Sequence, residues 1–383
     1  MNEDTVELLG RSARFDICSA DGCLGRQGAG RKRMPGLPRW IYPAVTPDGR
    51  TVLIMKVLMA NQCQNSCAYC ANRLGGHERA AEFSPDELVR TFLDLRDRGL
   101  ARGLFLSSAV ADRPNTIMDR MLTAVETLRL RHRFSGYVHL KILPGASFDR
   151  IERAVELADR VSVNLEAPGP DRLRAIAGEK DYEADLLTRM RWVRDLMALK
   201  EGAACRGQTT QFVVGAAGES DREIVTTVAR VYRELRLERT YFSAFQPLAD
   251  TPLEAMPPTP LMREHRLYQT EFLLRRYRWT LDDIMFGPDG NLSLTSDPKL
   301  TWAAAHPERF PIEVNRARYH ELLRVPGIGP KSAQRIVHGR TQGRFTALSD
   351  LRAMGAVTKR AAEFVLISGR RPETEPGQLT MSF

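Results

Sequence analysis

Three of the six cysteines in the chain lie within eight residues, at Cys63, Cys67 and Cys70, and Tyr69 directly precedes the last of them. A disulfide, a zinc site, an iron-sulfur cluster and a chance grouping would each explain such a cluster. The chain begins without the pattern of a secretory leader, so we expect a reducing, cytoplasmic compartment. There, clustered cysteines bind metal or do chemistry more often than they form disulfides. A zinc site would add His77 as its fourth ligand.

The elements that position these cysteines are alternating strands and helices. Six short apolar runs predict buried strands, at residues 51–59, 104–109, 137–143, 161–166, 209–214 and 240–245. Helical patterns separate them, and the first begins with Ser84 as cap, Pro85 at the first position and Glu87 completing a capping box. Repetition of this unit predicts a parallel sheet, either doubly wound or a barrel, with its chemistry at the carboxyl ends of the strands. The cysteine loop follows the first strand, so it lies at such an end.

The cysteine spacing, Tyr69 and the place of the loop resemble the signature of the radical S-adenosylmethionine (radical SAM) enzymes. The resemblance implies an α/β fold with a partial (β/α)6 TIM-like barrel. It also implies that Cys63, Cys67 and Cys70 bind three irons of a 4Fe-4S cluster, while the fourth iron binds S-adenosyl-L-methionine (SAM). Three thiolates leave a coordination position open, as a catalytic metal site requires. An electron from the cluster would release methionine and a 5′-deoxyadenosyl radical, so we expect a donor such as flavodoxin or ferredoxin.

Polar residues at the predicted strand ends are candidates for binding SAM. Members of the family usually carry a Gly-Gly-Glu type stretch after the second strand, where this chain has Ser107 and Ser108. Asn164 and Glu166 are two residues apart on a predicted strand and therefore point to the same face. The residues assigned to the cofactor are Tyr69, Ser107, Ser108, Asn164, Glu166, Gln211, Ser243 and Gln246. The alternative for each strand-end side chain is that it satisfies a neighbouring backbone group.

A second motif lies at residues 322–337, LLRVPGIGPKSAQRIV. Gly327 and Gly329 permit positive φ and close backbone approach, and Pro330 takes the first position of the following helix, whose amides can face a phosphate. Ile328 is predicted to plug the hairpin, and Lys331 adds charge. The segment resembles the helix-hairpin-helix motif of DNA repair and DNA uptake proteins, and residues 348–365 repeat it in degenerate form.

This resemblance implies a small all-α domain of tandem hairpins that grips duplex DNA through its backbone, with little sequence reading. The candidate DNA-binding residues are Gly327, Ile328, Gly329, Lys331, Ser332, Gly355, Lys359 and Arg360. A tight helical turn used for protein packing is the alternative.

Positive charge concentrates in the same region. The chain has a net charge of +9, and residues 315–371 carry twelve Lys or Arg against three Asp or Glu, which equals the excess of the whole chain. Such a concentration is the electrostatic pattern of a phosphate-binding module. The twelve are Arg316, Arg318, Arg324, Lys331, Arg335, Arg340, Arg344, Arg352, Lys359, Arg360, Arg370 and Arg371.

The 383 residues are enough for two or more domains. We predict an N-terminal extension (1–50), a radical SAM core (51–280), a connector (281–314), the tandem hairpins (315–371) and a flexible tail (372–383). The tail resembles the peptide by which bacterial DNA-processing proteins dock on the sliding clamp, with anchors at Gln378, Leu379, Met381 and Phe383. A frayed terminus is the alternative. No run of 18 apolar residues predicts a membrane span, and Cys18, Cys23 and Cys205 receive no role.

Together the two motifs predict a radical SAM enzyme that repairs or modifies a nucleotide of DNA. The combination resembles, over almost the whole chain, a bacterial family of DNA modification or repair radical SAM proteins. A stacked base cannot reach a buried cofactor, so the target would be flipped out or already damaged. Two alternatives remain open: an RNA-modifying radical SAM enzyme, and a redox-sensing DNA-binding protein whose cluster does no catalysis.

Overall fold

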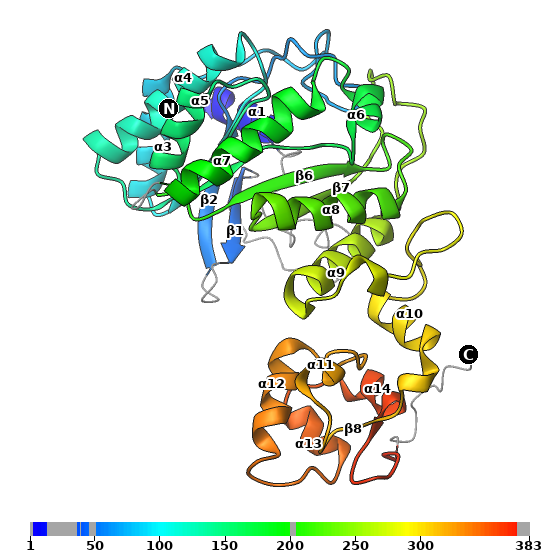
Figure 1. The fold of residues 1–383 in the computed structure, drawn as a ribbon. Helices are drawn as coiled ribbons and strands as arrows, with labels where there is room; N and C mark the ends of the chain where they lie inside the picture. Colours follow the sequence, from blue (N-terminus) through cyan, green and yellow to red (C-terminus); the bar gives the residue numbers. More distant parts are fainter. Residues whose placement is uncertain (1–2, 14–36, 39, 46–50, 200–203, 374–383) are drawn as a thin grey trace. The chain divides into compact units, whose positions relative to one another are not determined.

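The computed structural model describes residues 3–13, 37–38, 40–45, 51–199 and 204–373 (Figure 1). The chain divides into two compact units, Met1–Glu264 and His265–Phe383. The division falls inside helix α9 (Leu261–Tyr277). Among the described residues, no helix is long and apolar enough to cross a membrane.

The first unit is built on a seven-stranded sheet whose spatial order follows the chain. Its strands are β1 (Ile41–Val45), β2 (Thr51–Leu58), β3 (Gly103–Ser107), β4 (Tyr137–Lys141), β5 (Arg160–Ser162), β6 (Gln208–Val214) and β7 (Arg239–Ala244). β1 pairs antiparallel with β2, and every later pair is parallel. A doubly wound sheet reverses its order at a switch point, which this order does not do. The sheet curls instead into a half-barrel with β1 and β7 at its edges, so the predicted partial barrel is confirmed.

Helices between the strands form one layer, because α3, α4, α5, α7 and α8 contact one another in succession. Their bounds are α3 (Pro85–Asp97), α4 (Pro114–Glu126), α5 (Phe148–Leu157), α7 (Thr188–Leu199) and α8 (Asp221–Leu235). The short helix α6 (Pro170–Ile176) and the π-helical segment η3 (Tyr182–Leu187) precede α7. The capping box predicted at Ser84 and Glu87 is present in α3, and Ser220 with Glu223 caps α8 in the same way.

Three features of this unit differ from the sequence prediction. Strand β5 ends at Ser162, four residues earlier than expected, and Glu166 has a positive φ of 63° and forms only an isolated bridge to Phe212. Strand β1 was not predicted, because Pro43 argues against a strand except at a sheet edge, which is where β1 lies. Helix α1 (Glu3–Ser12), which packs on β2, was also missed.

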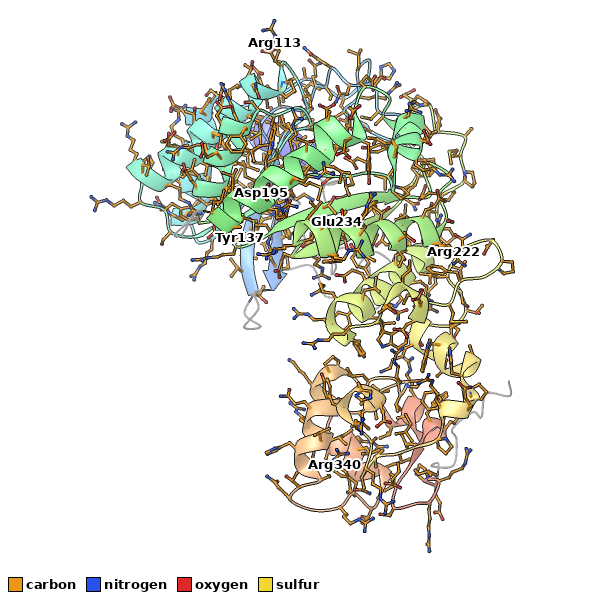
Figure 2. The ribbon with its side chains drawn as sticks, in the orientation of Figure 1. Arg113, Tyr137, Asp195, Arg222, Glu234 and Arg340 are labelled. Atoms are coloured by element: carbon orange, nitrogen blue, oxygen red, sulfur yellow. The ribbon has the colours of Figure 1, made fainter. Side chains whose placement is uncertain are left out.

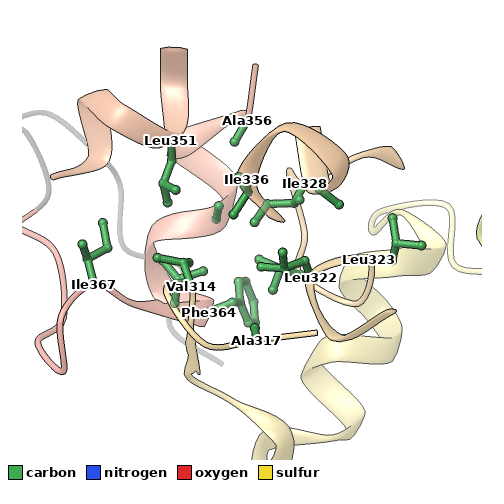
Figure 3. Packing of buried hydrophobic residues seen from close by; sticks show 14 of the residues in the cluster. Val314, Ala317, Leu322, Leu323, Ile328, Ile336, Leu351, Ala356, Phe364 and Ile367 are labelled. Atoms are coloured by element: carbon green, nitrogen blue, oxygen red, sulfur yellow. The ribbon is translucent and has the colours of Figure 1, made fainter. Parts of the chain in front are cut away.

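The second unit is mainly helical. It contains α10 (Pro298–Ala305), α11 (Tyr319–Leu322), α12 (Pro330–Gly339), α13 (Leu348–Ala353), α14 (Thr358–Ala361) and one parallel pair of two-residue strands, β8 (Ile312–Glu313) with β9 (Val365–Leu366). Both hairpins bury apolar side chains in a shared core that includes Val314, Leu322, Ile328, Ile336 and Leu351 (Figure 3). Ala303 and Phe310, from the segment predicted as a connector, pack against this core as well.

Candidate functional site

A cavity of about 540 Å³ lies at the carboxyl ends of the strands in the first unit. Its size is within the usual range of small-molecule sites, about 300–1,000 Å³. Every residue that the sequence assigned to the cluster or to SAM lines it, namely Cys63, Cys67, Tyr69, Cys70, Ser107, Ser108, Asn164, Glu166, Gln211, Ser243 and Gln246. The structure therefore brings these side chains together, while their individual roles stay predictions.

The cysteine loop is held by segments that are distant in the sequence. Asn61 is buried, and its side-chain amide donates to Arg79 O and accepts from Ala81 N, both at 2.8 Å. The backbone N–H of Ala68 donates to Ile176 O at 2.8 Å, and that of Ser66 donates to Glu179 Oε1 at 3.0 Å. Because these contacts come from outside the loop, its shape depends on the folded barrel.

The three thiols are free and lie in a shielded position. Cys67 is 6% exposed, and Cys63 and Cys70 are half-buried. Burial raises the pKa of Cys67 above its ordinary value and that of Cys70 to about 12. A metal centre that binds these sulfurs must displace their protons, so its binding is coupled to proton release.

The arrangement does not match the zinc site that the sequence left open. Among the described residues, which include His77, no group of three or more His, Cys, Asp or Glu side chains surrounds a single metal position. A cluster makes a different demand, because each thiolate binds a different iron and the sulfurs need not converge on one point. The three free thiols around one cavity fit a cluster with three cysteine ligands.

Lys180 is a charged residue of this site that sequence reasoning missed. Its Nζ lies 3.5 Å from Glu166 Oε1, and the two side chains are only 9% and 10% exposed. Burial by itself would lower the pKa of Lys180, but Glu166 and the three cysteines raise it above its ordinary value. Lys180 therefore keeps its positive charge beside the thiols. No pattern in the sequence connects this loop residue with the cysteines.

Glu166 also joins Tyr69 to this pair. The hydroxyl of Tyr69 makes a hydrogen bond with Glu166, and burial, followed by the charge of Glu166, raises the pKa of Tyr69 well above its ordinary value. Tyr69 is thus a neutral hydrogen-bond donor to Glu166. The aromatic residue before the last cysteine links the cysteine loop to the segment after β5.

Two of the predicted cofactor residues satisfy backbone groups, as the alternative interpretation expected. Ser108 Oγ accepts from Ala60 N at 3.2 Å. Gln246 Nε2 donates to Phe245 O at 2.8 Å and to Thr259 O at 3.2 Å. Both side chains still line the cavity. Cys205 is buried away from it, with its Sγ 3.4 Å from Gly207 O.

The first hairpin of the second unit has the predicted backbone geometry. Gly327 has φ of +85°, and a Cβ on it would lie 2.5 Å from Val357 O. Its carbonyl accepts from Val357 N at 2.8 Å, which joins the two hairpins. Ile328 is 1% exposed and packs in the core between the helices, as predicted. Gly329 is the N-cap of α12.

The second hairpin departs from the first. Gly355 has the expected positive φ of 88°, but Val357 is 53% exposed, and the neighbouring Ala356 is buried in its place. Ser332, a DNA-binding candidate, is buried as well, so its side chain serves packing in this unit. Lys331 and Lys359 are exposed.

Several of the basic side chains counted from the sequence are used inside the unit. Arg324 lies against the rings of both Trp279 and Trp302, 4.4 and 4.6 Å from their centroids, and pairs with Asp283 at 2.7 Å. Arg340, labelled in Figure 2, donates to Ala317 O at 2.5 Å and to Val314 O at 3.2 Å.

Arg360, a DNA-binding candidate, forms an ion pair with Asp297. The positive charge available to a partner is therefore smaller than the sequence count suggests. Cys18 and Cys23, which receive no role, and the predicted clamp-binding residues Gln378, Leu379, Met381 and Phe383 lie outside the described residues.

Comparisons with known proteins identify one domain type in each region. Residues 57–231 match the family model described as Radical SAM superfamily, and residues 309–364 match the model described as Helix-hairpin-helix motif. No curated protein matches the chain.

Three solved structures are similar to part of this chain at low identity. HydG, a maturase of the FeFe-hydrogenase, is 12% identical with a TM-score of 0.46, and the match covers 57% of this chain and 48% of that chain. Methylornithine synthase (PylB) is 12% identical with a TM-score of 0.46, and the match covers 57% of this chain and 60% of that chain. A radical SAM methyltransferase from Sphaerobacter thermophilus is 15% identical with a TM-score of 0.44, and the match covers 61% of this chain and 74% of that chain. The match thus spans about half of HydG and three-fifths of PylB.

Proposed function

Since this chain is a radical SAM enzyme with a helix-hairpin-helix motif in its C-terminal region, we propose that its substrate is DNA, in which it repairs or modifies a nucleotide. The observation that carries the proposal is the pairing of two features in one chain. One is a cavity lined by three free cysteines, and the other is a hairpin unit that exposes Lys331 and Lys359.

Members of the superfamily use a 4Fe-4S cluster and SAM, which supply a 5′-deoxyadenosyl radical that takes a hydrogen atom from the substrate. Cys63, Cys67 and Cys70 would hold the cluster. Lys180 would offset part of the negative charge of their thiolates, because it is buried beside them and stays protonated. Glu166 holds Lys180 in place and accepts a hydrogen bond from Tyr69.

The walls of the cavity would orient the substrate and exclude water. Its lining includes the apolar side chains of Leu58, Val110, Ile142, Val213 and Phe245, which surround the polar groups at the strand ends. A site of this kind protects a reactive intermediate from side reactions with solvent. The electron needed for each turnover would come from a flavodoxin or ferredoxin, in the reducing cytoplasm.

The hairpin unit would hold the duplex by its phosphates. Exposed Lys331 and Lys359 flank the two glycine turns, and the first turn ends at the N-terminus of α12. Contacts of this type position a protein on DNA and carry no sequence information directly. We therefore expect the choice of target nucleotide to be made in the cavity of the first unit. Docking of the tail on a sliding clamp stays a prediction.

The proposal is tested by assaying 5′-deoxyadenosine under anaerobic conditions. The protein is loaded with iron and sulfide, reduced, and given SAM with duplex DNA, with a matched RNA duplex, or with no nucleic acid. We expect a yield that requires Cys67, as shown by a Cys67→Ala variant, and that rises with DNA. The rise should be lost when Lys331 and Lys359 are both replaced by Glu.

Two outcomes would reject the proposal. A larger rise with RNA than with DNA would make the protein an RNA-modifying enzyme. A fully loaded cluster that cleaves no SAM under any condition would favour the redox-sensing alternative.

A further inference from the structure

One polar side chain of the cavity has no role in the site described so far. Asn72 lies two residues after Cys70 and lines the cavity, but the sequence did not single it out. Its side-chain oxygen, Oδ1, is buried and has no hydrogen-bond partner. Of the described residues that line the cavity, Asn72 alone has a buried side-chain oxygen or nitrogen atom in this condition.

The backbone around Asn72 is held by the loop that carries the cysteines. The N–H of Asn72 donates to the sulfur of Cys70. The N–H of Cys70 in turn donates to Cys67 O at 3.2 Å, and that of Leu74 donates to Asn65 O at 2.8 Å. These hydrogen bonds place Asn72 at the end of the cavity where the cysteines lie.

The unpaired oxygen needs a partner that donates a hydrogen bond. A buried acceptor without a partner is costly, and such groups are nearly always paired in folded proteins. Tyr69 and Lys180, which also lie beside the cysteines, already have a partner in Glu166. Because an amide oxygen can only accept, we look for a donor among the groups that enter the cavity.

SAM carries donors of this kind. It has an amino group on its methionine portion, another on its adenine, and hydroxyls on its ribose. The methionine portion offers an iron the chelating pair of an amine and a carboxylate, so it is the portion expected at the cysteine end of the cavity. Of these two groups, only the amine can donate a hydrogen bond.

We propose that Asn72 positions SAM by accepting, at Oδ1, a hydrogen bond from the amino group of the methionine portion. Asn72 thus orients the end of the cofactor that meets the cluster, without binding iron itself. The inference goes beyond the proposed function, because it holds whichever substrate the enzyme acts on.

Calorimetric binding of SAM and two analogues tests the inference without turnover. The wild type and Asn72→Leu, both loaded with an oxidised cluster, are titrated with SAM and with each analogue. One analogue has hydrogen in place of the methionine amino group, and the other has oxygen in place of the adenine amino group.

Asn72→Leu should weaken SAM binding by roughly tenfold or more, as expected for the loss of a hydrogen bond to a buried acceptor. It should weaken the analogue without the methionine amine by less than about twofold, since that analogue has no donor to lose. The adenine analogue should be weakened as SAM is.

Two further variants control for the loop and for the acceptor. Asn65 also lines the cavity, and its N–H also donates to a cysteine sulfur, Cys63 Sγ at 3.4 Å, but it has no buried side-chain atom without a partner. Asn65→Leu should therefore bind SAM as the wild type does. Asn72→Asp keeps an oxygen acceptor in place and should retain most of the SAM affinity.

Thermal unfolding of the cluster-free protein gives a second readout. Asn72 Oδ1 has no hydrogen bond to lose in the free protein, so Asn72→Leu should melt no lower than the wild type. A lower melting temperature would assign the side chain a structural role and overturn the inference. Iron content after loading shows that the titrated proteins carry equal clusters, and Asn72→Ala replaces Asn72→Leu if the latter takes up less iron.

The titrations overturn the inference if Asn72→Leu binds SAM as the wild type does, since the oxygen then bonds to water. They also overturn it if Asn72→Leu weakens SAM and the analogue without the methionine amine equally, or if the adenine analogue alone escapes the effect. Losses as large in Asn65→Leu or Asn72→Asp as in Asn72→Leu would reject it too. No nucleic acid is present, so each of these results is independent of whether DNA is the substrate.

Discussion

At the scale of single residues, the cysteine loop depends on a buried charge pair that no sequence pattern identifies. Lys180 and Glu166 are both about one-tenth exposed, and Tyr69 donates to the same carboxylate. A buried pair of this kind is costly to break, because removal of one partner leaves the other charge without compensation. The pair therefore couples the stability of the first unit to the integrity of its cysteine site.

Replacement of Lys180 by Met should destabilise the protein without a cluster by about 3–5 kcal/mol, the usual cost of breaking a buried pair. The double variant Lys180→Met with Glu166→Gln should be destabilised less than Lys180→Met alone, because no unpaired carboxylate remains. Urea unfolding of both variants measures the difference, and iron content after loading reports the cysteine site. Equal destabilisation by the single and double variants would show that the charge pair is not the cause.

The three cysteines that line the cavity could be singled out from the sequence because their spacing is local, and the strand-end residues because strands of this length have a simple parity. Lys180 could not, since its contact with Glu166 depends on how the segment after α6 returns to the cysteine loop. The prediction that Asn164 and Glu166 share a face came from a strand that in fact ends at Ser162. Both residues nevertheless line the cavity.

At the scale of elements, one glycine and one lysine stabilise the first hairpin. Gly327 allows the close approach of Val357, and Lys299 Nζ donates to Ile328 O at 2.5 Å while lying 4.8 Å from the ring centroid of Tyr277. The local motif predicted the glycine, because its turn requires positive φ. Lys299 comes from α10, outside the motif, so its role appears only in the folded unit.

Gly327→Ala should destabilise the second unit and weaken DNA binding, because the new Cβ would meet Val357 O at 2.5 Å in a left-handed conformation. The strained φ alone costs about 1–3 kcal/mol. Gly343→Ala is the control, since no atom lies within 4 Å of the added Cβ and its φ is not positive. Thermal unfolding and fluorescence anisotropy with duplex DNA compare the two, and similar behaviour would contradict the hairpin geometry.

Lys299 should give this unit a distinctive pH dependence. Burial lowers its pKa to about 7, Arg360 and Arg324 add to the shift, and Asp297 opposes it. An unfolded lysine titrates near 10.4. Between these values the unfolded chain binds more protons, so stability rises with pH, by at most about 1.4 kcal/mol per pH unit.

Thermal unfolding of the full-length wild type and of Lys299→Met is compared at pH 7, 8 and 9. The difference in stability between the two proteins isolates the contribution of Lys299, because the titrations of all other groups cancel. Wild-type stability should increase relative to the variant as pH rises. A difference that does not change with pH would mean that Lys299 is protonated throughout this range.

At the scale of the whole molecule, the net charge of +9 overstates the charge offered to a partner. Arg324, Arg340 and Arg360 are engaged by rings, carbonyls or carboxylates within the second unit, whereas Lys331 and Lys359 are exposed. The sequence count located the basic region correctly. It could not separate the arginines engaged inside the unit from the exposed lysines, because that distinction depends on tertiary contacts.

The salt dependence of DNA binding by the full chain should separate these two groups. Lys331→Gln and Lys359→Gln should each lower the slope of log affinity against log salt by about one, since each removes one phosphate contact. Arg324→Gln should leave the slope unchanged and lower the melting temperature, because it removes the guanidinium group that lies against the rings of Trp279 and Trp302. Equal slopes for all three variants would show that charge is not distributed as the structure indicates.

The anchoring of the cysteine loop has a consequence for biosynthesis. The loop donates hydrogen bonds to Arg79 O, Ile176 O and the Glu179 carboxylate, and its balancing charge comes from Lys180. While the ribosome is still making the chain, the cysteines emerge well before Ile176, Glu179 and Lys180 do. We therefore expect iron and sulfide to be bound correctly only after the segment through Lys180 has left the ribosome.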